Sequence, residues 1–184
     1  MTALPALGGY QASFDGVTLQ EVTATAIVSI AIPLGGDDAM AKALQDAYGT
    51  AIPRAGHTSL ANDGATRFLG MSSEQMFAVF DHAGAHALDV IAGNLKDAGY
   101  YTLQSDNWVA LRISGPRSRD ALERICPIDL NSAAFPQGKV ARTTMEHLGV
   151  IIYPDDTDSF ILLSGSSSAG SFLHALETSI HNIL

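Results

Sequence analysis

The chain has 184 residues, of which 47% are hydrophobic and 16% charged, and its net charge at pH 7 is −9. This composition excludes a disordered chain and is typical of a globular protein with a sizeable core. The negative charge disfavours binding to the phosphate backbone of nucleic acids, and the low content of charged residues suggests that part of the surface is covered by a partner or a second copy.

The first half of the chain shows alternating strand and helix patterns. Residues 1 to 20 contain scattered glycines and predict an irregular arm with one short strand near Val17 to Leu19. Residues 24 to 103 then predict a βαββαβ unit. Its elements are a strand over 24–32, a helix from about Met40 to Gly49, a loop over 50–64, a hairpin of 65–71 and 75–80, a helix from Leu88 to about Gly99, and an extended stretch over 100–103.

The second half repeats this rhythm. It predicts strands over 107–113, 139–147, 148–153 and 158–163, and helices over 116–126 and 168–182. We therefore predict an α+β protein of two tandem ferredoxin-like units, with residues 1–104 holding the arm and the first unit and residues 105–184 holding the second. Because the second unit ends on a helix, one edge of its sheet is expected to be short, covered or paired with another chain.

Several short motifs gather between residues 104 and 143. They are Ser105-Asp106 with Trp108, Ser114-Gly115-Pro116 with Arg119, Cys126-Pro127-Ile128-Asp129-Leu130, Phe135-Pro136 with Gly138, and Ala141-Arg142-Thr143. In order and spacing this set resembles the gamma subunit of heterotetrameric sarcosine oxidase, and the strong similarity covers about residues 104 to 176. The resemblance implies a fold related to the folate-binding aminomethyltransferase (glycine cleavage T-protein-like) fold.

The resemblance also implies a function. In that family FAD, FMN and NAD lie on the alpha and beta subunits, zinc lies on delta, and tetrahydrofolate is thought to bind alpha. This chain is therefore expected to be a non-catalytic assembly subunit that contacts alpha, beta and delta. The whole complex demethylates sarcosine oxidatively to glycine, with formaldehyde or methylene-tetrahydrofolate and hydrogen peroxide as further products.

Residues that could carry chemistry have simpler structural explanations. Cys126 is the only thiol and has apolar neighbours, so it is expected to be a buried structural residue in a reducing compartment. His82 and His86 have the i, i+4 spacing of a zinc pair, but the helix is expected to start only near Gly84, so capping is favoured. Neither a secretion signal nor a membrane-spanning stretch is evident, and we expect a cytoplasmic protein.

Three loops have some of the features of catalytic or binding sites. The stretch 165–170 lies between a strand and a helix like a nucleophile elbow, but its serines are expected to cap the helix. The Ser114-Gly115-Pro116 turn could hold an anion beside Arg117 and Arg119, but it is expected to be structural. The acidic stretch 155–158 lacks the pattern of a calcium loop and is expected to be a solvated hairpin tip. No catalytic, cofactor-binding or metal-binding residue is predicted.

Trp108, Arg112, Arg119 and Arg142 are the candidates for partner contact, and local anchoring is the other interpretation of each. Two further functions remain open. One is a separate module that binds a folate-like molecule, for which Asp106 and Glu146 are the candidate carboxylates. The other is the same subunit role in a complex that acts on another N-methyl amino acid, such as N-methylglutamate.

Overall fold

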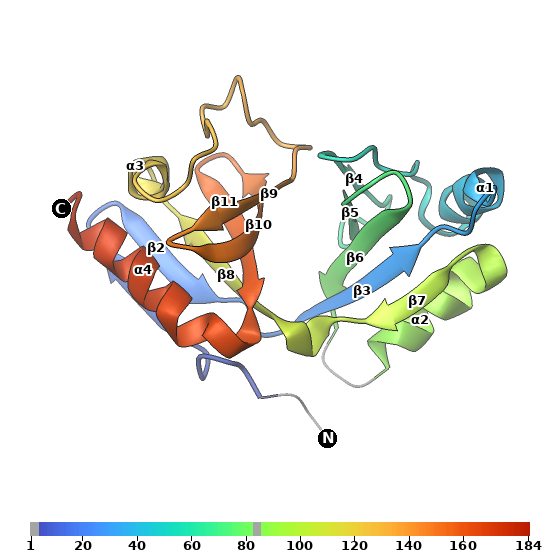
Figure 1. Cartoon of the computed structure of the whole chain (residues 1–184), viewed down its shortest axis with the longest axis horizontal. Helices are drawn as coiled ribbons and strands as arrows, with labels where there is room; N and C mark the ends of the chain where they lie inside the picture. The colour runs from blue at the N-terminus through green and yellow to red at the C-terminus, as the bar shows by residue number, and fades with distance from the viewer. Residues whose placement is uncertain (1–3, 83–85) are drawn as a thin grey trace. The chain divides into compact units, whose positions relative to one another are not determined.

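The computed structural model describes residues 4–82 and 86–184 and divides the chain into two compact units (Figure 1). One unit comprises residues 24–106, and the other comprises residues 4–23 together with 107–184. The division after Asp106 lies close to the expected one at 104. The predicted position of the arm is wrong, because residues 4–23 belong to the second unit and not to the first.

The first unit is an antiparallel sheet with helices formed by the predicted segments. Its sheet has the order β4-β5-β6-β3-β7. The elements are β3 (Thr25–Ala31), α1 (Asp37–Tyr48), β4 (Thr58–Leu60), β5 (Arg67–Gly70), β6 (Gln75–Asp81), α2 (Ala87–Leu95), the 3-10 turn η1 (Lys96–Ala98), β7 (Tyr100–Leu103) and the 3-10 turn η2 (Ser105–Asn107). Without β4 this is the ferredoxin-like strand order. β4 lies in the segment 50–64, which was expected to be a loop. The sequence does not predict this strand because three residues are too few to show an alternating pattern.

The second unit contains the remaining elements around its own core. They are β1 (Gln11–Phe14), β2 (Val17–Glu21), β8 (Trp108–Ser114), α3 (Ser118–Glu123), β9 (Ala141–Met145), β10 (Leu148–Asp156), β11 (Ser159–Gly165), the 3-10 turn η3 (Ser166–Ser168) and α4 (Ala169–His181). The sheet order is β1-β2-β8-β11-β10-β9. Leu111 and Ile113 of β8 are fully buried in one cluster with Leu122 of α3 and Phe172 of α4, as the alternation along β8 predicts.

The N-terminal hairpin β1–β2 completes the sheet of the second unit. β2 pairs antiparallel with β8, the first strand of the C-terminal segment 107–184, just as β7 pairs with β3 in the first unit. The closing strand that the C-terminal half lacks is therefore supplied by the start of the same chain, and Leu19 of this strand is fully buried. One edge of this sheet was expected to be short, covered or paired with another chain. It is paired instead by residues 17–21 of the same chain, in the segment predicted to be a mostly irregular arm.

Polar contacts hold the start of this arm against its own strand β2 and fasten it to α4. The Glu21 carboxylate accepts hydrogen bonds from the backbone N–H groups of Leu7 (3.0 Å) and Gly9 (2.7 Å). The Tyr10 hydroxyl donates to Oε1 of Glu177 on α4 at 2.6 Å. Burial and, to a smaller degree, this carboxylate raise the pKa of Tyr10 to about 12. The phenol therefore stays protonated and keeps its donor role across the physiological range.

Candidate partner-contact surface

Arg119 is a local anchor. It projects from α3, donates through Nε to the carbonyl of the fully buried Leu130 at 3.1 Å, and forms an ion pair with Asp158 at the β10–β11 turn. Its guanidinium also lies 5.3 Å from the ring centroid of the buried Phe160. One side chain thus joins a helix, a loop and a turn, which accounts for an arginine here without a partner protein.

Arg112 is also used inside the second unit. Its Nε lies 2.9 Å from Oδ2 of Asp155, whose side chain is 18% exposed. Together with the Arg119 pair, this contact corrects the expectation for residues 155–158. Two of the three aspartates there, Asp155 and Asp158, are held by arginines, so the hairpin tip is not simply solvated.

The turn at Ser114-Gly115-Pro116 is structural, as expected. Gly115 has φ +113°, and a Cβ there would lie 2.5 Å from the carbonyl oxygen of Gly16. The Ser118 hydroxyl, on a buried residue, donates to the carbonyl of Asp158 at 3.1 Å. Arg117 donates to the carbonyl of Ile183. The groups that could have held an anion therefore bind the turn to its neighbours.

Trp108 and Arg142 lie together at a surface hollow of the second unit. The hollow has a volume of about 510 Å³ and is lined by these two side chains with Thr143, Leu148, Gly149, Val150, Ile151, Ser164, Gly165 and Ser168. Trp108 is half-buried at the start of β8, whereas Arg142 is exposed on β9 and forms no ion pair within the described parts of the chain. Tryptophan and arginine beside apolar residues make up the composition that binding hot spots favour.

The serine-rich segment before α4 differs from its expectation. Ser168 occupies the N-cap position of α4 but makes no side-chain cap hydrogen bond. Residues Ser166–Ser168 form the 3-10 turn η3, so the expected cap by Ser168 is not observed. Gly165 and Ser168 line the hollow with Trp108. This segment is thus a part of the candidate surface that the sequence did not indicate, because only the fold brings it next to β8.

Cys126 is buried, as expected. Burial raises the pKa of its thiol, which keeps the sulfur protonated and unreactive.

His82 and His86 do not share a helix. His82 follows β6, while His86 precedes α2 at Ala87 and places its Nδ1 3.0 Å from Oδ2 of Asp89. The expected helix start at Gly84 lies outside the described residues. Among the residues that the structure describes, no three histidine, cysteine, aspartate or glutamate side chains gather as metal ligands would. None of the described helices combines the length and the apolar character needed to cross a bilayer.

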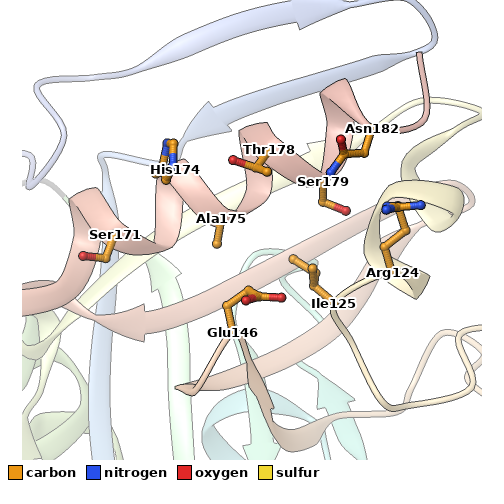
Figure 2. Close-up of a pocket in the computed structure, with 9 residues that line it drawn as sticks. All are labelled: Arg124, Ile125, Glu146, Ser171, His174, Ala175, Thr178, Ser179 and Asn182. Carbon is orange, nitrogen blue, oxygen red and sulfur yellow. The ribbon is translucent and has the colours of Figure 1, made fainter.

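The two candidate carboxylates for a folate-like ligand lie in different units. Asp106 is exposed in η2, at the end of the first unit. Glu146 lies in the second unit, at the turn between β9 and β10, and lines a cavity of about 420 Å³ beside α4 (Figure 2). Both residues of this two-residue turn have left-handed backbones, with φ +47° at Glu146 and +67° at His147. A tight hairpin requires such angles, which Asn-Gly adopts far more readily than Glu-His.

Replacing Glu146 by asparagine and His147 by glycine is therefore expected to stabilise the protein. Asparagine and glycine adopt positive φ at a lower cost than glutamate and histidine do. We therefore expect the free energy of unfolding to rise by about 1–2 kcal/mol. Thermal unfolding followed by circular dichroism measures it. Glu74→Asn, in a hairpin whose glutamate does not have positive φ, should leave the midpoint unchanged. An unchanged or lower midpoint for the double variant would show that this turn carries no strain.

Comparison with known proteins identifies structural relatives only. No family model and no curated protein matches the sequence. A chain of the heterotetrameric sarcosine oxidase from Corynebacterium sp. U-96, solved in complex with pyrrole 2-carboxylate, matches with a TM-score of 0.77 and 24% identity, over 93% of this chain and 87% of that chain. The glycine cleavage system aminomethyltransferase T from Bartonella henselae matches with a TM-score of 0.67 and 12% identity, over 95% of this chain and 56% of that chain. The expected α+β fold, similar to both proteins, is confirmed.

Proposed function

We propose that this chain is a structural subunit of a sarcosine oxidase-type flavoenzyme complex. Its fold matches nearly the whole of one chain of a heterotetrameric sarcosine oxidase, and the two chains are of similar length. The motifs between residues 104 and 143 resemble the gamma subunit of that family. In this proposal alpha, beta and delta subunits are the partners, and they carry FAD, FMN, NAD, tetrahydrofolate and zinc. The assembled complex, an oxidoreductase, demethylates sarcosine.

The observation that carries the assembly role is the hollow at Trp108 and Arg142. Of the four candidate residues, Arg112 and Arg119 are engaged inside the unit, while Trp108 and Arg142 border a surface hollow lined by both apolar and polar side chains. Trp and Arg are enriched among the residues that lose their contact with water at the centre of protein interfaces, and an exposed arginine beside a half-buried tryptophan fits that pattern. We therefore assign this hollow as the contact with a partner subunit.

Co-expression with the alpha, beta and delta subunits, followed by affinity purification on a tag carried by this chain, tests the proposal. The unaltered chain is expected to recover a complex that contains flavin. Trp108→Ala and Arg142→Glu are each expected to weaken recovery at least about 30-fold, because loss of a hot-spot residue costs about 2 kcal/mol or more. Arg54→Glu reverses the charge of an exposed arginine in the first unit and serves as the control.

Recovery of no flavin-containing complex by the unaltered chain would contradict the subunit role. Full recovery with both variants would contradict only the assignment of the hollow. The same experiment with subunits of an N-methylglutamate-type complex asks whether another N-methyl amino acid is the substrate of the assembly.

A separate ligand-binding role is the second candidate. It is favoured by the similarity in fold to aminomethyltransferase T, although this chain spans only 56% of that protein. Calorimetric titration of the isolated chain with tetrahydrofolate distinguishes the two functions. Saturable binding at micromolar concentration supports the module, whereas its absence together with complex formation supports the assembly subunit.

A further inference from the structure

The cavity beside α4 is built from three separate segments of the second unit (Figure 2). Arg124 and Ile125 follow α3, and Glu146 comes from the β9–β10 turn. One side of α4 and its C-cap Asn182 supply the rest of the lining: Ser171, His174, Ala175, Thr178, Ser179 and Asn182. Its volume of about 420 Å³ is within the range of sites for small molecules. None of the proposed partner-contact residues lines it.

The cavity is lined by two opposite charges, on the exposed residues Arg124 and Glu146, that do not pair with each other. Arg124 and Glu146 form no ion pair, with each other or with any other residue in the described segments. This distinguishes Arg124 from Arg112, Arg117 and Arg119, each of which has an acidic partner nearby. A guanidinium and a carboxylate that line one cavity without pairing can each bind an opposite charge on the same ligand.

The lining includes two apolar side chains, Ile125 and Ala175, among polar ones. Figure 2 shows Ile125 between the Glu146 carboxylate and the Arg124 side chain, with Ala175 on the α4 wall above Glu146 and Asn182 near the arginine. A ligand that spans this distance needs a cationic group at Glu146, a hydrocarbon segment over Ile125 and Ala175, and an anionic group at Arg124. An anion or a cation alone would leave one of the two protein charges without its counter-charge.

The backbone at Glu146 supports the same conclusion. Glutamate is a poor residue for a left-handed turn position, where asparagine or glycine is preferred, yet the turn places its carboxylate in the cavity. Strained positions of this kind cluster at ligand sites, because the benefit of binding compensates for the local cost.

We propose that this cavity binds a small zwitterion of the amino-acid class. Its ammonium group pairs with Glu146, its carboxylate with Arg124 and the Asn182 amide, and its carbon chain covers Ile125 and Ala175. The site belongs to the second unit alone, so the proposal does not depend on the assembly role.

Titration of the ¹⁵N-labelled full chain, followed by NMR chemical shifts, tests the proposal. The probes are glycine, β-alanine and 4-aminobutyrate, in which one or more CH₂ groups separate the charges. Butyrate and butylamine each lack one charge and are the ligand controls. At least one zwitterion is expected to bind with a Kd of about 1 mM or lower and to shift signals of Ser171, His174 and Thr178. Both controls should bind at least about tenfold more weakly.

Variants identify the two charges. Arg124→Gln and Glu146→Gln are each expected to weaken zwitterion binding about tenfold or more. The matched controls Arg54→Gln and Glu74→Gln alter exposed residues of the first unit and should leave it unchanged. Ala175→Phe fills the cavity without altering a charge and should abolish binding. A dispersed spectrum confirms that each variant is folded.

Three outcomes would overturn the proposal. One is the absence of saturable shifts at the cavity residues with every zwitterion at about 10 mM, well above a millimolar Kd. Another is binding of butyrate or butylamine as tightly as the best zwitterion, which would indicate a site for a single charge. The last is unchanged affinity in folded Glu146→Gln or Arg124→Gln.

Discussion

Replacing Leu19 by alanine is expected to lower the free energy of unfolding of the second unit by about 2–5 kcal/mol, as for other fully buried leucines. Leu19 is 0% exposed and lies in β2, opposite Ile113 of β8. The substitution leaves a cavity between the N-terminal hairpin and the core that α3 and α4 cover. The effect should therefore reach the whole unit, although the residue lies in a short arm far from the rest of that unit in the sequence.

Urea titration followed by tryptophan fluorescence measures this effect, because Trp108 is the only tryptophan and belongs to the second unit. Leu4→Ala is the matched control. It makes the same chemical change in the same arm, but Leu4 is 90% exposed. The free energy of unfolding should therefore change by no more than about 0.5 kcal/mol. Equal midpoints for the two variants would mean that the arm does not complete the sheet.

Replacing Arg119 by alanine is expected to lower the unfolding free energy by about 2–3 kcal/mol. The largest part comes from the hydrogen bond to the carbonyl of Leu130, because removing the donor to a buried acceptor costs about 1–3 kcal/mol. The contact with the Phe160 ring adds about 0.5–1 kcal/mol. The ion pair contributes least, because the Asp158 side chain is 41% exposed and water screens the charges.

Arg119→Lys separates these contributions. Lysine keeps a positive charge near Asp158 but cannot reproduce the planar group that contacts Leu130 and Phe160 together. We expect it to recover less than half of the stability lost in Arg119→Ala, measured by the same fluorescence titration. Full recovery by lysine would mean that charge alone matters, and no loss in either variant would exclude the anchoring role.

Most elements of the fold could be predicted from local patterns. The alternation in β8, the helical spacing in α4 and the turn at Ser114-Gly115-Pro116 all correspond to the observed structure, because one buried face sets the period of each element. The sequence does not predict β1 and β4. Strands of three or four residues have too few side chains to show a period, and their pairing with a neighbouring strand defines them.

The candidate sites were harder to predict than the fold. Four residues were singled out by type and motif, yet Arg112 and Arg119 bind residues 43 and 39 positions later, and those contacts exist only in the folded unit. Glu146 was named as a possible ligand of a folate-like molecule. The sequence did not indicate that it shares a cavity with Arg124 and α4, because these residues lie on separate segments that the sheet brings together.

By itself the sequence determined the class of fold, the order of nearly all elements and the burial of Cys126, because each depends on short-range periodicity or on apolar neighbours. Only the tertiary structure decided that residues 4–23 close the sheet of the second unit and which arginines are free to meet a ligand or a partner. Pairing between strands and between charges is chosen by position in space, and residues distant in the chain carry no local signal of it.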